Sequence, residues 1–154
     1  MNNPFLLPPT DETFMRAALE EAVRAYEAGE VPIGAVVVAG DRIIGRGYNQ
    51  TESLRDVTAH AEMLALTSAQ NTLGAKVLPE CVLYVTVEPC VMCAGAIRWS
   101  RVGRLVWGCD EPKVGFTTIS SEILHPKTTV SRGILADEAR ELMRRFFEER
   151  RVGK

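Results

Sequence analysis

Short β-type runs alternate with segments of helical period along this chain, and that order leaves few folds open. Runs rich in β-branched residues occupy 33–39, 42–48, 82–87 and 104–108, while helical patterns occupy 11–28, 59–70, 90–99 and 136–150. Strands separated by helices form a largely parallel sheet covered on both faces. The first two runs are joined only by Gly40 and Asp41, which predicts one antiparallel hairpin. We therefore expect an α/β fold.

The length of 154 residues predicts a single domain that spans residues 1–154. Residues 1–9 contain three prolines and no period, which is typical of a loose N-terminal arm. Thr10 or Asp11 is the expected cap of the first helix, and Gly29 its stop. Residues 49–58 and 110–133 are expected to be loop-like, because neither stretch shows a regular pattern.

No apolar run approaches the roughly 20 residues that a membrane span requires. The N-terminus lacks the basic-then-apolar pattern of an export signal, so we expect a cytoplasmic protein and no membrane partner. Of the four cysteines, Cys90 and Cys93 form a C-x-x-C pair, which in a reducing compartment indicates metal or redox chemistry. Cys81 and Cys109 fall outside this spacing and are expected to be core thiols.

Two short motifs bring together an imidazole, two thiols and a carboxylate. His60 and Glu62 begin a predicted helix, and Cys90 and Cys93 begin another directly after Pro89. One nitrogen and two thiolate ligands suit one Zn²⁺ ion, and three protein ligands leave a fourth position for water, as in catalytic zinc sites. Glu62 lies too close to His60 in sequence to ligate easily beside it, but it can exchange protons with such a water.

Simpler interpretations exist for each residue alone. The C-x-x-C pair is compatible with a redox function or with buried thiols, His60 with a helix-capping role, and His125 with a loop histidine or a substrate contact. In combination, however, H-x-E and P-C-x-x-C form the signature of zinc-dependent nucleobase deaminases.

The chain resembles the bacterial tRNA-specific adenosine deaminases (TadA-type) of the cytidine-deaminase-like superfamily, from about residue 12 to residue 151. The matching segments are 31–38, 47–49, 56–62, 83–97, 133–138 and the pair Phe146-Phe147. The resemblance implies a three-layer α/β/α fold with a mixed, mostly parallel five-stranded sheet and helices on both faces. It further implies hydrolytic deamination of adenosine to inosine at the wobble position, 34, of a tRNA anticodon stem-loop.

The same resemblance assigns roles to individual residues. His60, Cys90 and Cys93 would bind zinc, Glu62 would be the catalytic proton donor, and Asn49 would contact the target nucleoside. Without the resemblance, Asn49 is a turn residue at the end of the hairpin. A homodimer with the active site near the interface is also implied.

The charge distribution leaves the substrate open. Residues 1–97 hold 6 basic and 12 acidic residues, whereas residues 98–154 hold 12 basic and 8 acidic ones. The basic half, including Arg98–Arg104 and the C-terminal helix, suits RNA phosphates. The net charge of −2, Gln50 and the composition of 116–130 favour an alternative, deamination of a free nucleobase or nucleoside such as guanine or cytosine. A second alternative is a structural zinc site in a non-catalytic subunit, against which Glu62 argues.

Overall fold

The computed structural model describes residues 4–152 and contains four α-helices, a 3-10 helix and five strands within that range. In chain order these are α1 (Asp11–Glu27), β1 (Gly34–Ala39), β2 (Arg42–Tyr48), α2 (Ala61–Leu73), β3 (Cys81–Val87), α3 (Val91–Ser100), β4 (Arg104–Cys109), η1 (Phe116–Thr118), β5 (Thr129–Arg132) and α4 (Ala136–Val152). Residues 1–3 of the expected N-terminal arm lie outside the described residues, and Phe5, Leu6 and Leu7 are exposed.

The five strands form one mixed sheet in the order β2-β1-β3-β4-β5. Strand β1 is antiparallel to both β2 and β3, whereas β3, β4 and β5 are mutually parallel. Four strands therefore run in one direction, which confirms the mostly parallel α/β sheet. The hairpin is not the only antiparallel pairing, however, because α2 packs across both β2 and β1 and the chain returns on the far side of β1.

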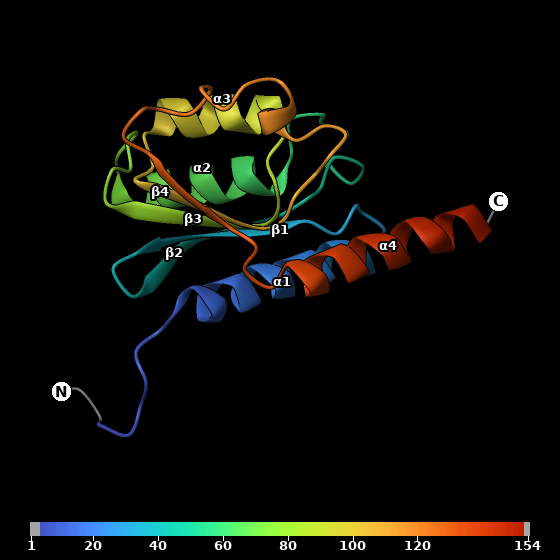
Figure 1. The fold of residues 1–154 in the computed structure, drawn as a ribbon, viewed down its shortest axis with the longest axis horizontal. Helices are drawn as coiled ribbons and strands as arrows, with labels where there is room; N and C mark the ends of the chain where they lie inside the picture. Colours follow the sequence, from blue (N-terminus) through green and yellow to red (C-terminus); the bar gives the residue numbers. More distant parts are fainter. Residues whose placement is uncertain (1–3, 153–154) are drawn as a thin grey trace.

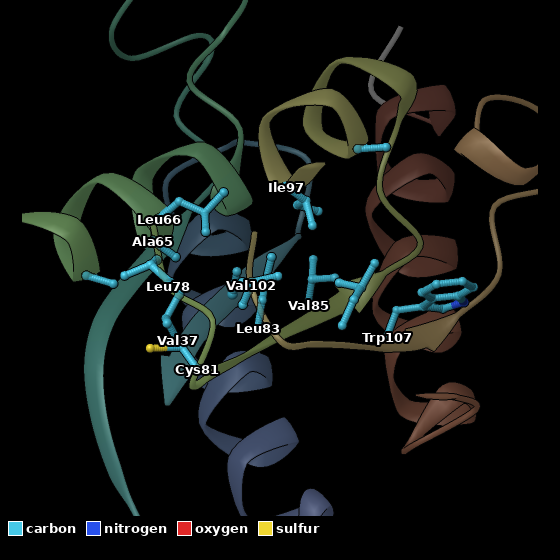
Figure 2. Packing of buried hydrophobic residues seen from close by; sticks show 14 of the residues in the cluster. Val37, Ala65, Leu66, Leu78, Cys81, Leu83, Val85, Ile97, Val102 and Trp107 are labelled. Atoms are coloured by element: carbon cyan, nitrogen blue, oxygen red, sulfur yellow. The ribbon is translucent and has the colours of Figure 1, made fainter. Parts of the chain in front are cut away.

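Helices cover both faces of the sheet, as Figure 1 shows: α2 and α3 lie on one face, and α1 and α4 lie on the other. The core follows from the alternation of side chains along each strand. Val37, Leu83 and Trp107 point toward α2 and α3, where they pack with Ala65 and Ile97 (Figure 2). A second cluster on the opposite face contains Phe14, Met15, Ala18, Val36, Val38, Tyr84 and Val106.

Capping and turn residues place the start of α1 and the β1–β2 turn where the sequence predicts them. Thr10 caps α1 by accepting a hydrogen bond from the backbone N–H of Thr13. Gly40 adopts a positive φ of 61° in the two-residue turn between β1 and β2, as a tight hairpin requires. In the described part of the chain, no helix has the length and apolar composition to cross a membrane.

Candidate functional site

Two helix N-termini on the same face of the sheet bring the predicted chemical groups together. His60 is the N-cap residue of α2, and Cys90 is the N-cap residue of α3, directly after β3. Neither side chain makes a capping hydrogen bond at the start of its helix, and both approach the same point. The partial positive charge at a helix N-terminus favours the thiolate form of cysteine.

The three predicted ligand atoms form a compact cluster. His60 Nδ1 lies 3.6 Å from Cys90 Sγ and 3.4 Å from Cys93 Sγ, and all three donor atoms lie within 4.8 Å of one another. In a tetrahedral zinc site with Zn–N of about 2.0 Å and Zn–S of about 2.3 Å, nitrogen and sulfur ligands are about 3.5 Å apart. The donor set and its spacing therefore fit Zn²⁺.

The cluster also shifts the protonation of its members. The pKa of Cys90 is lowered to about 4, first by a hydrogen bond with Cys93 and then by one with His60. Burial of the thiol acts in the opposite direction. The same contact with Cys90 raises the pKa of Cys93, and the hydrogen bond with Cys90 raises the pKa of His60. A stabilised thiolate at Cys90 is the form that binds a metal.

Glu62 lies in the first turn of α2, beside the cluster and almost fully buried at 4% exposure. Burial raises the pKa of its carboxyl group to about 7, because desolvation disfavours the charged form. A carboxyl group with a pKa near neutrality can both accept and donate a proton at physiological pH. Its surroundings therefore allow Glu62 to exchange a proton near neutral pH.

A pocket of about 300 Å³ opens beside these groups. It is lined by Val31, Ile33, Asn49, Thr51, His60, Ala61, Glu62, Val87, Glu88, Cys90, Glu111, Val114, Met143 and Phe147. Asn49 directly follows β2; its Nδ2 donates to the Val31 carbonyl at 3.3 Å, and its Oδ1 accepts from the Thr51 backbone at 3.3 Å. Asn49 is thus both a turn residue and a wall of the pocket.

A second, larger groove of about 750 Å³ adjoins the pocket along α4. The two share Val87, Glu111, Val114, Met143 and Phe147. The groove is lined by five basic side chains, Lys113, Arg140, Arg144, Arg150 and Arg151, against the acidic Asp110 and Glu111. Basic side chains of the C-terminal half therefore border the pocket.

The other predicted contacts lie elsewhere. Arg104 begins β4, at the end of the sheet opposite Cys90, where it binds Asp11 and Ser131. Arg98 donates to the carbonyls of Ile123 and Leu124. Neither side chain lines the pocket or the groove, so the structure does not support the expectation that Arg98–Arg104 faces an RNA at this site. Neither His125 nor any residue of 116–130 lines the pocket or the groove.

Two buried glutamates near the pocket were not predicted from the sequence as functional residues. Glu88 accepts hydrogen bonds from the backbone of Glu111 and from the backbone and hydroxyl of Thr117, which holds the 111–117 loop. Glu30 bonds in a similar way to residues 52–53. Glu88 could have been noticed from the sequence because it directly precedes Pro89 of the P-C-x-x-C motif. Glu30 belongs to no chemical motif, so the sequence does not point to it.

Comparisons with known proteins agree with this arrangement. The family model "cytidine and deoxycytidylate deaminase zinc-binding region" matches residues 8–109. The tRNA-specific adenosine deaminase of Agrobacterium fabrum is 44% identical over 144 residues, which cover 90% of this chain and 95% of that protein. A chloroplastic tRNA(adenine(34)) deaminase of Arabidopsis thaliana is 43% identical over 161 residues, but this chain spans only 12% of its length.

Two solved structures share the fold. One, from work on A-to-I editing by tRNA:A34 deaminases, has a TM-score of 0.79 and 44% identity and covers 84% of this chain and 97% of its own. The guanine deaminase from Nitrosomonas europaea has a TM-score of 0.77 and 31% identity and covers 94% of this chain and 88% of its own. Since the family model matches well over half of the sequence, the chain belongs to the cytidine and deoxycytidylate deaminase zinc-binding family.

Proposed function

We propose that this protein is a zinc-dependent hydrolytic deaminase that converts adenosine to inosine at the wobble position of a tRNA anticodon loop. The observation that carries the proposal is the cluster of His60, Cys90 and Cys93 beside the buried carboxyl group of Glu62, at a pocket of about 300 Å³. The similarity to tRNA adenosine deaminases over most of the chain supports this substrate.

His60, Cys90 and Cys93 would hold the zinc ion through Nδ1 and two Sγ atoms. Zinc bound there acidifies water and so supplies a nucleophile at neutral pH. Glu62 takes the proton of the attacking water and delivers it to N1 of the adenine ring as the C6–O bond forms. Glu62 then takes the proton of the new C6 hydroxyl group and passes it to the amino group as the C6–N bond breaks, so that water and adenosine give inosine and ammonia.

Asn49 is proposed to position the target nucleoside. Its amide uses one N–H on Val31 and one acceptor site on Thr51. A carboxamide has two N–H donors and two acceptor sites, so one of each remains for a ligand. The pocket volume lies at the lower end of the range for small-molecule sites, which suits one base swung out of a single-stranded loop.

The basic groove along α4 is proposed to bind the phosphates of the anticodon stem-loop. Arg140 and Arg151 face the groove from one helix, and Lys113 faces it from the loop after β4. Phosphate contacts supply most of the affinity for nucleic acids, and the groove opens into the pocket, so a bound loop can insert its base. A cytoplasmic location is proposed together with this substrate.

We further propose a homodimer. The chain exposes apolar side chains on the outside of α3, where Trp99 is 77% and Val91 46% accessible, and in the loop before α2, where Val57 is 83% accessible. Such residues favour an interface between copies. Sedimentation velocity is expected to give twice the monomer mass, and a monomeric species at micromolar concentration would contradict the proposal.

A free purine base is the second candidate substrate, because the chain also shares its fold and 31% of its residues with a guanine deaminase. The deciding experiment incubates zinc-loaded protein with a stem-loop carrying adenosine at the wobble position, and separately with free adenosine, guanine and cytosine. Ammonia release and product mass identify the substrate. Inosine in the stem-loop alone is the expected result, whereas turnover of a free base with an untouched stem-loop would favour the second candidate.

A further inference from the structure

Glu30 is a buried carboxylate with no part in the chemistry proposed for the zinc cluster. It lies in the connection between α1 and β1, and only 1% of its surface is exposed. The next residue, Val31, lines the pocket, as does Ile33. A buried charge needs partners that replace water.

Three hydrogen bonds from one loop satisfy this carboxylate. Oε1 accepts from the backbone N–H of Glu52 at 3.0 Å, and Oε2 accepts from the backbone N–H of Ser53 at 2.7 Å and from its hydroxyl at 2.6 Å. Burial raises the pKa of Glu30, but these bonds outweigh it and hold the pKa below the usual value. The group therefore stays ionised, and its hydrogen bonds are charge-assisted and strong.

These bonds join two walls of the pocket. One wall is the segment after Glu30, with Val31 and Ile33, and the other is the segment before Glu52, with Asn49 and Thr51. Asn49 connects the walls on the pocket side, since its backbone N–H donates to the Ile33 carbonyl at 3.1 Å and its side chain donates to Val31. Glu30 connects the same two segments through residues 52–53 and does not itself line the pocket.

The loop needs this support, because it is otherwise poorly anchored. Glu52 and Ser53 are exposed, and Leu54 is 54% accessible, so little packing holds the segment down. Arg55 adopts a positive φ of 50°, which a non-glycine residue rarely does. The other backbone hydrogen bonds of the loop are mainly between its own residues and to Ala59.

We propose that Glu30 is a positioning residue of the deaminase, because its carboxylate clamps residues 52–53 against 30–33 and so fixes the wall that carries Asn49. The inference rests on the proposed function, since Asn49 is the residue taken to orient the target base. Loss of the clamp would let the base drift from the attacking geometry. Displacement of reacting groups by about 1 Å can cost about 100-fold in rate.

Glu30→Gln tests the clamp with little change of shape. A glutamine has one carbonyl oxygen, and its amide N–H₂ would face a backbone N–H where Glu30 now accepts. Ser53→Ala is a milder change that removes only the hydroxyl donor. Glu21→Gln is the matched control, because Glu21 is also buried, at 3% exposure, but pairs with Arg24 and Arg46 and does not line the pocket.

The measurement is single-turnover deamination of the anticodon stem-loop with zinc-loaded protein in excess, which reports the rate on bound RNA whatever fraction of the protein is folded. For Glu30→Gln we expect this rate constant to fall about 10- to 100-fold, the loss typical of one or two charge-assisted hydrogen bonds. The half-saturating protein concentration should change less than about threefold, because phosphate contacts dominate affinity. Ser53→Ala should lower the rate about threefold, within the range of a single neutral hydrogen bond, and Glu21→Gln should leave it unchanged.

Amide hydrogen exchange supplies a second readout. Exchange at Glu52 and Ser53 should accelerate in Glu30→Gln, with β3 unaffected. A wild-type rate in Glu30→Gln and Ser53→Ala would overturn the clamp, and so would an equal loss of rate in Glu21→Gln. Absence of turnover by the wild-type protein would instead overturn the proposed function, and the positioning role with it.

Discussion

Glu62 and Glu30 are both buried glutamates, yet their surroundings give them opposite protonation behaviour. Burial raises the pKa of Glu62 to about 7. Burial acts on Glu30 as well, but hydrogen bonds from Ser53 and the backbone of Glu52 lower its pKa below the ordinary value. Glu62 can thus carry a proton near neutral pH, whereas Glu30 remains a fixed anion. Burial outweighs the hydrogen bonds at Glu62 and is outweighed by them at Glu30, and this balance separates a group suited to proton transfer from one suited to holding a loop.

The first prediction concerns Glu62. Glu62→Gln should lower kcat at least about 1000-fold, within the range for loss of a general acid–base group, because glutamine cannot transfer the proton. Zinc content should stay near one ion per chain, since the ligand set of His60, Cys90 and Cys93 is untouched. Metal analysis and turnover on the stem-loop are measured on the same sample. Near-normal kcat in this variant would remove Glu62 from the mechanism.

Residues that carry recognisable chemistry could be predicted from the sequence, whereas residues that act through geometry could not. His60, Cys90 and Cys93 share a motif pair and meet in space, as their spacing implied. Glu30 belongs to no motif, and its partner, Ser53, lies 23 residues away in an irregular loop. Nothing in local sequence records such a pairing.

At the scale of elements, α1 and α2 approach the sheet through glycines. A Cβ on Gly34 of β1 would lie 2.1 Å from the backbone oxygen of Ala18 in α1. A Cβ on Gly45 or Gly47 of β2 would lie 2.4 or 2.5 Å from backbone oxygens of α2. Backbone atoms cannot move aside as side chains do, so these contacts set the distance between helix and sheet.

The second prediction follows from this contact. Gly34→Ala should lower the free energy of unfolding by about 2–3 kcal/mol, because the added methyl must push α1 away from β1. Gly95→Ala is the control: a Cβ on Gly95, inside α3, meets nothing within 4 Å. That change should stabilise the protein by up to about 1 kcal/mol through helix propensity. Urea unfolding of the two variants should therefore move in opposite directions, and equal shifts would contradict the close-approach argument.

Elements with a buried face could be predicted, and elements without one could not. The predicted helix over 136–150 is confirmed as α4, because its apolar side packs on β3 and β4. Strand β5 was not located within the stretch 110–133. Three of its four residues are exposed, so Thr129–Arg132 has no apolar alternation to reveal it.

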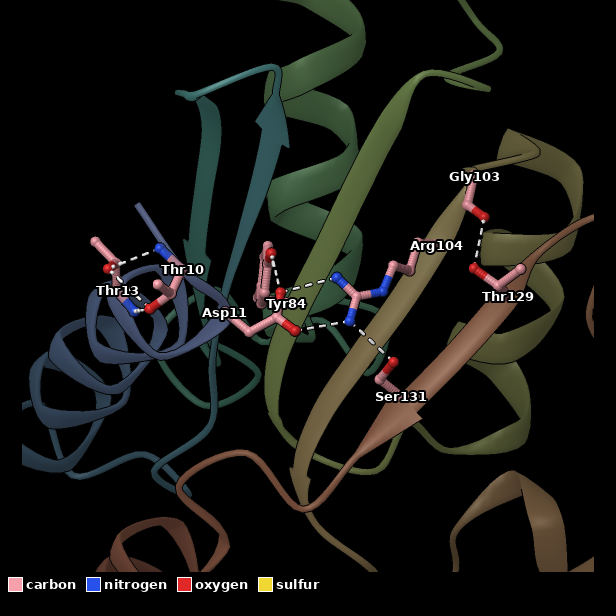
Figure 3. A network of polar contacts seen from close by, with 8 residues as sticks. All are labelled: Thr10, Asp11, Thr13, Tyr84, Gly103, Arg104, Thr129 and Ser131. Carbon is pink, nitrogen blue, oxygen red and sulfur yellow. Dashed lines mark hydrogen bonds and ion pairs between the residues drawn. The ribbon is translucent and has the colours of Figure 1, made fainter. Parts of the chain in front are cut away.

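At the scale of the whole molecule, one polar network ties the start of α1 to the sheet. Arg104 of β4 donates to both carboxylate oxygens of Asp11, at 2.8 and 2.7 Å, and to the hydroxyl of Ser131 in β5 (Figure 3). Tyr84 of β3 also donates to Asp11 at 2.8 Å. Three elements, α1, β3 and β4, meet at this carboxylate, and β5 joins the network through Arg104, at the end of the sheet opposite Cys90.

The third prediction is the pH dependence of this network. The hydrogen bond from Arg104 lowers the pKa of Asp11 in the folded protein. A lowered folded pKa adds stability above the unfolded value of about 3.9, and this stability is lost as the pH falls through the folded value. Asp11→Asn should therefore reduce Tm clearly at pH 7 and progressively less below pH 4. Asp137→Asn, in an exposed pair with Arg140, should leave Tm unchanged, and a pH-independent difference for Asp11→Asn would contradict the argument.

The distribution of charge over the whole molecule provides a test that distinguishes the two candidate substrates, an RNA and a free base. The net charge is −2, yet the groove that opens into the pocket carries five basic side chains. Lys154, a basic residue that follows α4, lies outside the described residues. Arg150 donates to the Gly29 carbonyl and stacks on Phe146. A substitution of Arg150 would therefore change the stability of the fold as well as RNA binding. Arg151 lines the groove and is exposed, which makes it the sharper probe of RNA binding.

The fourth prediction is therefore that Arg151→Glu weakens binding of the stem-loop about 10-fold at low salt and reduces the slope of log affinity against log salt by about 1. Arg42→Glu makes the same change of charge on an exposed residue at the opposite end of the sheet, and it should alter binding far less. Fluorescence anisotropy at several salt concentrations measures both quantities. An enzyme that acts on a free base would show turnover independent of salt and of Arg151, because a neutral base releases no counterions. Equal effects of the two charge reversals would mean that the RNA responds only to net charge, and α4 would then lose its place as the RNA-binding element.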